Sequence, residues 1–229
     1  MKRIIFLFFL SILPLAMMAQ QPEPVKGVVR QAVDEWQFHY GTEWYSATVP
    51  GCIHTDLMAH DFIPDPHIGT NEERSQWIST NTWDYRATVV LDKKMRAKNR
   101  VDLVFEGLQT YADISINGVW KKRCNNMFRQ WRVSIPVHSL KEENYQITID
   151  IHFLPTGPKD DSLLARLHFD VPDHRVFSRT APYQQGWDWG PKLNSCGIWK
   201  PVYLEGWDSR DNRAQEYEIP NRNSKLWGQ

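Results

Sequence analysis

Three adjacent residues, Trp187, Asp188 and Trp189, place one carboxylate between two indole rings. A pyranose has apolar C–H faces that can lie on an indole and a rim of hydroxyls that a carboxylate can bind by charge-assisted hydrogen bonds. The following Gly190-Pro191 pair predicts a turn that fixes the backbone direction. These residues alone leave two interpretations open. They form a sugar-facing group or, as is commoner for aromatic residues near turns, two core anchors with Asp188 stabilising the turn.

The other reactive side chains are three widely spaced cysteines, Cys52, Cys124 and Cys196. Their spacing matches no metal motif, and the nearby pair of Cys52 and His54 is typical of a structural contact. We therefore expect no metal site, no cofactor and no thiol catalysis. In an oxidising compartment one disulfide could form and leave one thiol over, and the sequence leaves the pairing open.

The composition is that of an ordinary folded protein. Of the 229 residues 41% are hydrophobic and 24% are charged, and the 11 tryptophans help to raise the aromatic content to 13%. Such a content favours a β-rich core or a surface for flat apolar ligands. The 27 basic residues balance the 27 acidic ones, so no net field would attract nucleic acid or an anionic membrane. We expect neither as a partner.

Both ends of the chain differ from its middle. Residues 1–19 combine Lys2 and Arg3, an apolar run too short to span a bilayer, and a small-residue site ending at Ala19, which predicts a signal peptide. The mature protein is therefore expected to be exported, periplasmic or secreted, and not bound to a membrane. Residues 20–208 are expected to form one domain. Residues 209–229 lack apolar periodicity and predict an irregular or disordered tail.

The middle of the chain alternates apolar and polar residues in short runs, which is typical of half-buried strands. The Asn117-Gly118 pair predicts a tight hairpin, and 52–60 a short helix. Several antiparallel strands of this length favour an all-β, two-sheet sandwich, but periodicity cannot choose between a jelly roll and an immunoglobulin-like topology. The expected strands begin with 36–38 and 45–49 and continue with 83–91, 101–105, 112–116, a strand containing Trp120, 131–135 and 145–153.

An irregular insertion follows residue 153. Pro155, Gly157 and Pro158 end the alternation, and Asp160 or Asp161 is expected to cap a short helix. The last expected strand therefore begins only at residue 198 and ends at 204. The insertion before it is a long loop that contains the aromatic and acidic residues 187–189. Loops held by a rigid sandwich are where binding residues usually lie.

Five segments together resemble the N-terminal sugar-binding domain of β-mannosidases in glycoside hydrolase family 2. The resemblance covers roughly residues 36–207 and implies a jelly-roll β-sandwich of the galactose-binding-domain type, with short helices in loops. In complete family members, immunoglobulin-like domains and a (β/α)₈ barrel follow, and the enzyme removes terminal β-mannose with retention. The segments are VPGCIHTDL, NTWDYRATVVL, LVFEGLQTYADISINGV, NMFRQW and APYQQGWDWGPKLNSCGIWKPVYLE.

The resemblance implies that catalysis resides elsewhere. A retaining glycosidase needs two carboxylates about 5 to 5.5 Å apart. In this family both are glutamates on the barrel, which alone takes around 250 residues. The pair Asn71-Glu72 looks like the family's Asn-Glu acid/base motif, but it precedes the hairpins and has no barrel strand pattern around it. We therefore assign no catalytic residue and reject Glu72 as the acid/base.

The resemblance does carry over a binding role. In the family the acid of the WDWG segment reaches the pocket of the neighbouring barrel and contacts the hydroxyls of the terminal sugar, and Asp188 occupies that position. Trp187 and Trp189 would shape the pocket wall, and Asn71 lies in a loop that related members also point toward the sugar. The implied partners are a β-mannoside or manno-oligosaccharide and a catalytic barrel, which a separate chain could supply.

Three functional alternatives remain at this point. The first is the sugar-binding domain of a β-mannosidase without its catalytic half, and the second is a stand-alone carbohydrate-binding module. A non-functional truncated fragment is the third, favoured by the unusual residues after Trp207. If a barrel normally covers this domain, residues 186–191 should expose an apolar patch that the chain's own residues leave open.

Overall fold

A computed structural model describes residues 27–140, 144–157, 159–171 and 174–208, so the expected signal peptide and tail lie outside the described residues. Two antiparallel sheets face each other, with strand orders β3-β2-β4-β9-β6-β7 and β1-β12-β5-β8, and β10 pairs with β11. The strands are β1 Val29–Ala32, β2 Trp36–Tyr40, β3 Glu43–Ala47, β4 Trp83–Val90, β5 Arg100–Phe105, β6 Tyr111–Ile116, β7 Val119–Asn125, β8 Trp131–Ile135, β9 Gln146–Leu154, β10 Gln185–Trp187, β11 Gly190–Lys192 and β12 Val202–Trp207.

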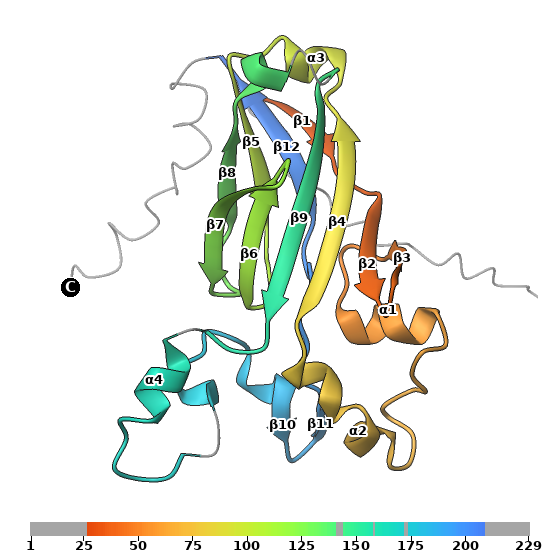
Figure 1. The fold of residues 1–229 in the computed structure, drawn as a ribbon, viewed down its shortest axis with the longest axis vertical. Coiled ribbons are helices and arrows are strands. Elements are labelled where there is room, and N and C mark those ends of the chain that lie inside the picture. The colour runs from red at the N-terminus through yellow and green to blue at the C-terminus, as the bar shows by residue number, and fades with distance from the viewer. Residues whose placement is uncertain (1–26, 141–143, 158, 172–173, 209–229) are drawn as a thin grey trace, which may run out of the picture.

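Short helical segments occupy the connections. Figure 1 places α3 at one end of the sandwich, while α2, α4 and the hairpin β10–β11 lie at the opposite end. This second end is called the hairpin end below. The α-helices are α1 Ile53–Ala59, α2 Asn71–Arg74, α3 Lys93–Arg96 and α4 Asp160–Leu164, and the 3₁₀ segments are η1 Gln76–Thr80, η2 Val137–Leu140, η3 His174–Val176 and η4 Pro182–Gln184.

The core lies between the two sheets and follows the alternation of the sequence. Along β9 every second residue from Ile147 to Phe153 is buried, and β4 pairs with it so that Tyr85 lies opposite Ile151. The tyrosine hydroxyl donates to the carboxylate of Asp56 at 2.7 Å, which satisfies both polar groups inside the core. The all-β sandwich is confirmed.

The predicted hairpin after β6 is also confirmed. Asn117 and Gly118 join β6 to β7 with backbone φ values of 49° and 72°. Both residues tolerate this left-handed region, which a tight hairpin turn requires. The short helix expected over 52–60 is present as α1.

Three sequence-based expectations need correction, and one strand was not expected. The last strand, β12, begins at Val202 rather than at residue 198, and the additional strand is β1 at the edge of the four-stranded sheet. Asp160 and Asp161 lie in the first turn of α4, whose N-cap is Lys159. Gly190 and Pro191 do not form the turn, because both belong to β11.

Candidate functional site

The loop expected to carry Asp188 is a small β-hairpin. Trp187 at the end of β10 pairs with Gly190 at the start of β11, so Asp188 and Trp189 form the two-residue turn between the strands. In β10, Gly186 has a φ of 95°, a conformation that favours glycine. The hairpin therefore presents the predicted carboxylate at its tip.

The aromatic side chains of this hairpin face solvent. Trp187 is 55% exposed and Trp189 is 71% exposed, and the ring of Trp189 lies 6.0 Å from that of Tyr183 in η4. Asp188 between the two tryptophans is exposed as well. The interpretation as core anchors is therefore wrong, and the expected uncovered apolar patch over residues 186–191 is confirmed within the described part of the chain.

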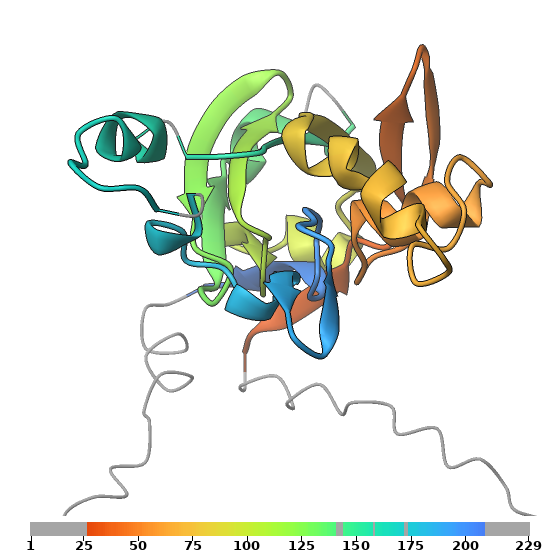
Figure 2. The same cartoon turned by 90° about the horizontal axis from the view of Figure 1, so that it is seen from below.

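Asn71, the fourth predicted site residue, begins α2 at the same end of the sandwich (Figures 1 and 2). Its side-chain Nδ2 donates to the backbone carbonyl of Asp65 at 3.0 Å. This bond orients the Asn71 amide. The helix that carries Asn71 also contacts the hairpin through its next residue, Glu72, so the structure joins the two predicted parts of the site.

Two side chains that sequence reasoning did not place in the site hold the hairpin at Lys192. The backbone N–H of Lys192 donates to Glu72 Oε1 at 2.8 Å, and its carbonyl accepts from Gln76 Nε2, also at 2.8 Å. Glu72 lies in α2 and Gln76 begins η1, and no local sequence pattern identifies either as a partner of Lys192. The carboxylate of Glu72 thus serves as a hydrogen-bond acceptor for the hairpin backbone.

The segment after the hairpin is tied to the sandwich. Gln109 Nε2 donates to the carbonyl of Ser195 at 2.7 Å, and the Ser195 hydroxyl lies 2.8 Å from Nδ1 of the buried His54. Burial lowers the pKa of His54 to about 4, so the ring is neutral near pH 7. A cavity of about 370 Å³ lies between this segment and the sandwich, with Tyr111 and Gln185 in its wall.

The three cysteines differ in their surroundings but share one state. Cys52, Cys124 and Cys196 are all free thiols in the structure, so the one bridge that the sequence allowed is not formed. Burial raises the pKa of Cys124 to about 12 and also raises that of Cys196, which disfavours the reactive thiolate. Among the described residues, no cluster of three or more His, Cys, Asp or Glu side chains could hold a metal ion.

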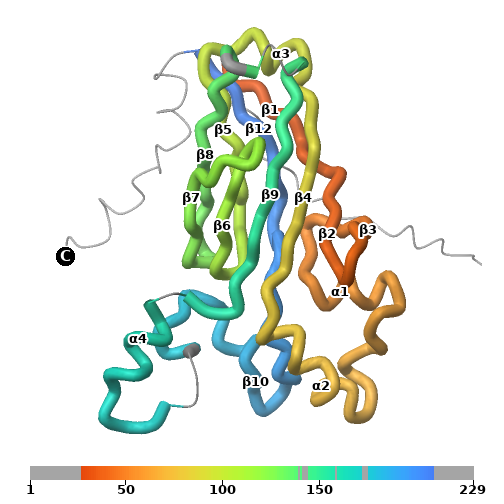
Figure 3. Tube along the Cα trace, in the orientation of Figure 1, coloured from red at the N-terminus to blue at the C-terminus, as the bar shows by residue number. Residues whose placement is uncertain are grey.

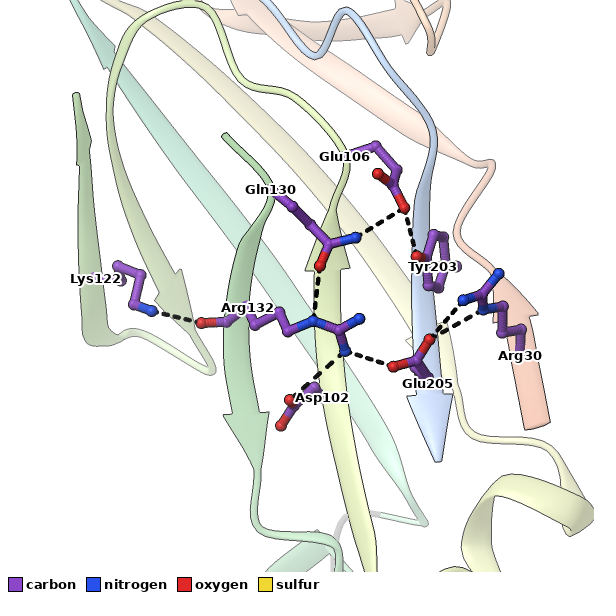
Figure 4. A network of polar contacts seen from close by, with 8 residues as sticks. All are labelled: Arg30, Asp102, Glu106, Lys122, Gln130, Arg132, Tyr203 and Glu205. Atoms are coloured by element: carbon purple, nitrogen blue, oxygen red, sulfur yellow. Dashed lines mark hydrogen bonds and ion pairs between the residues drawn. The ribbon is translucent and has the colours of Figure 1, made fainter. Parts of the chain in front are cut away.

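A second polar cluster covers the outer face of the four-stranded sheet, and sequence reasoning missed it (Figure 4). Glu205 on β12 is 1% exposed and accepts from Arg30 on β1 at 3.0 Å and from Arg132 on β8. Glu106 accepts from the hydroxyl of Tyr203, and burial together with this bond raises the tyrosine pKa. Both carboxylates accept hydrogen bonds from other side chains of the cluster, which is typical of a structural role.

The whole-chain comparison identifies the family. Residues 35–200 match the model of the glycosyl hydrolase 2 galactose-binding domain-like family. The chain belongs to this family. The matched residues include all strands of the six-stranded sheet, the strands β5 and β8 of the other sheet, and the hairpin β10–β11, whereas β1 and β12 lie outside the match. In the part of the chain that the structure describes, no helix has the length and apolar character needed to cross a membrane.

Relatives of the domain are β-mannosidases. It is 38% identical over 173 residues to β-mannosidase B of Thermothelomyces thermophilus, covering 70% of this chain and 19% of that one. With β-mannosidase B of Emericella nidulans it shares 35% over 180 residues, covering 73% and 20%. The chain thus spans about one fifth of the length of these curated relatives.

Solved structures agree on the fold. A β-D-mannosidase from Dictyoglomus thermophilum is similar with a TM-score of 0.69 and 32% identity, covering 79% of this chain and 23% of that one. An exo-chitosanase from Amycolatopsis orientalis is similar with a TM-score of 0.54 and 14% identity, covering 77% and 20%. The second likeness concerns the fold alone. The expected jelly-roll sandwich of the galactose-binding type is confirmed.

Proposed function

We propose that the hairpin β10–β11 is one wall of a sugar-binding pocket in a β-mannosidase-like glycoside hydrolase. The observation that carries this proposal is the exposed tip of the hairpin, where Asp188 lies between Trp187 and Trp189, exposed by 55% and 71%. The carboxylate would accept hydrogen bonds from hydroxyls of a terminal β-mannose, and the indoles would contact the apolar faces of the sugar ring. Asn71 would add an amide from the neighbouring helix.

The opposite wall and the chemistry would come from a catalytic barrel. The hairpin is open to solvent, and ligand pockets enclose most of their ligand, so a single wall is incomplete. The similar β-mannosidases are about five times as long as the matched region, which leaves room for a barrel with the two carboxylates of a retaining glycosidase. In this proposal the barrel belongs to a longer form of the protein or to a separate chain, and the domain orients the sugar.

A stand-alone carbohydrate-binding module is the second candidate. The cavity of about 370 Å³ beside the base of the hairpin favours it, because this volume falls within the range of small-ligand pockets. In that case the domain would bind mannose or a manno-oligosaccharide without a barrel. The proposed location is the same for both candidates: export through residues 1–19 to the periplasm or the exterior.

Titration of the 229-residue chain with methyl β-D-mannoside, followed by NMR, separates these candidates. If the hairpin is one wall, we expect shifts of the indole N–H signals of Trp187 and Trp189 only at millimolar sugar, and their loss in Asp188→Asn. Micromolar binding that calorimetry detects would favour the module. The absence of any hairpin shift at tens of millimolar sugar would contradict both.

An activity assay tests the proposal that the two catalytic carboxylates lie on the barrel. Because the barrel is proposed to carry both, the 229-residue chain should release no aryl group from an aryl β-mannoside. Turnover that survives purification and disappears in Glu72→Gln would identify Glu72 as the acid/base. It would contradict the proposal that the barrel carries both catalytic carboxylates.

A further inference from the structure

The hairpin β10–β11 is too small to define its own position. Each strand has three residues, and Pro191 in β11 has no backbone N–H to donate. A two-stranded hairpin of this kind is marginally stable in water when it is isolated. The orientation of Asp188 at the tip must therefore depend on contacts between the hairpin and the rest of the domain.

Two hydrogen bonds to the hairpin come from the segment formed by α2 and η1. Glu72 and Gln76 bind the two backbone polar groups of Lys192, each at 2.8 Å, across 120 and 116 residues of sequence. In the hairpin register Lys192 lies opposite Gln185, so these two hydrogen bonds fix the base of the hairpin. Figures 1 and 2 show α2 beside the hairpin at the end of the sandwich.

The segment formed by α2 and η1 is itself fixed to the sandwich. Ser75, between Glu72 and Gln76, is 2% exposed, and its hydroxyl donates to the carbonyl of Asn71 at 2.8 Å. Ile78 is 1% exposed, and its carbonyl accepts from the indole of Trp83 on β4 at 3.0 Å. Hydrogen bonds from this segment therefore hold the hairpin in a fixed position relative to the six-stranded sheet.

We infer that Glu72 is a positioning residue for Asp188. Its carboxylate accepts the Lys192 N–H, which fixes the hairpin against the helix that also carries Asn71, and so it sets the relative position of the two proposed sugar-binding groups. The functional meaning of this inference rests on the proposed sugar-binding role. The positioning itself rests on the bonds at Lys192 and can be measured without sugar.

Glutamine at position 72 separates positioning from charge. A glutamine side chain has nearly the same shape and keeps one carbonyl oxygen as an acceptor, whereas alanine removes the acceptor. A carboxylate needed for proton transfer would fail in both variants. The next residue in α2, the exposed Glu73, offers a matched control of the same type.

The first measurement is amide hydrogen exchange of the hairpin, resolved at Lys192 by NMR, in the 229-residue chain without sugar. We expect about tenfold faster exchange at Lys192 in Glu72→Ala, because the acceptor for the Lys192 N–H is lost. Glu72→Gln should remain near the wild type, and Glu73→Ala should match it. Gln76→Ala removes the other contact and should also speed exchange, which keeps the test open if Glu72→Ala does not fold.

The second measurement repeats the methyl β-D-mannoside titration with the same variants. The sugar-induced shifts of Trp187 and Trp189 should weaken in Glu72→Ala and return in Glu72→Gln. Exchange that changes as expected while the wild type shows no sugar shift would leave the positioning intact and contradict the proposed function. Unchanged exchange at Lys192 in Glu72→Ala, or equal loss in the alanine and glutamine variants, would overturn the inference.

Discussion

Two carboxylates of this domain lie in opposite environments. Glu205 is buried on the outer face of the four-stranded sheet between Arg30 and Arg132, whereas Asp188 is exposed at the tip of a hairpin between two exposed tryptophans. The first charge is neutralised by the domain's own side chains, as Figure 4 shows. The second is available to a molecule from outside. The comparison favours a stabilising role for the sheet face, and the exposure of Asp188 agrees with the recognition role that we propose for the hairpin end.

A large expected effect on stability tests the first half of this comparison. Glu205→Ala leaves two guanidinium groups on a largely buried face without their shared acceptor, and we expect a loss of about 3 kcal/mol in the free energy of unfolding. Urea denaturation at pH 7 measures it. The matched change Asp188→Ala should alter the same quantity by less than about 0.5 kcal/mol. Equal losses in the two variants would remove the distinction between the regions.

A smaller effect concerns the joint between the sandwich and the hairpin segment. The pKa of buried His54 is about 4 in the folded domain, below its usual value of 6.5, so the unfolded chain binds the proton more readily. Folding stability should therefore fall as pH drops from 6.5 toward 4. By pH 4.5 the protonation of His54 should have lowered the free energy of unfolding by about 2 kcal/mol.

Comparing unfolding at pH 7 and pH 4.5 in the wild type and in His54→Asn checks this expectation. Carboxylates also titrate in this range, so the informative quantity is the difference between the two proteins. The variant should lose about 2 kcal/mol less than the wild type. An identical loss in wild type and His54→Asn would show that His54 does not stay neutral in the fold.

The body of the sandwich could be predicted from the sequence because its signals are local. Alternation over eight residues in β4 and nine in β9 identifies the strands and their buried face, and Asn117-Gly118 identifies a turn. The edge strand β1 escaped this reasoning because four residues between prolines and a polar stretch show little alternation. Local patterns therefore describe the long central strands best.

The site could be predicted only in part. The residue types at 187–189 and the resemblance of the surrounding segment identified the candidate, but strands of three residues are too short for a period to show. Contacts between residues far apart in the sequence could not be predicted from local patterns. Glu72 binds Lys192 at a separation of 120 residues, and Arg30 binds Glu205 at a separation of 175 residues. The long-range contacts are what fix the hairpin and neutralise the sheet face.

The smallest expected effect on stability sharpens the second half of the comparison. Trp189 is 71% exposed and Trp207 on β12 is 2% exposed, so one substitution can be made in both environments. Trp189→Ala should change the free energy of unfolding by less than about 0.5 kcal/mol, whereas Trp207→Ala, which empties a buried site, should cost about 3 kcal/mol or more. Urea denaturation of the two variants gives both numbers. A loss above about 1 kcal/mol in Trp189→Ala would mean that the hairpin aromatics stabilise the domain itself, because an indole kept for an external ligand contributes little to folding until that ligand covers it.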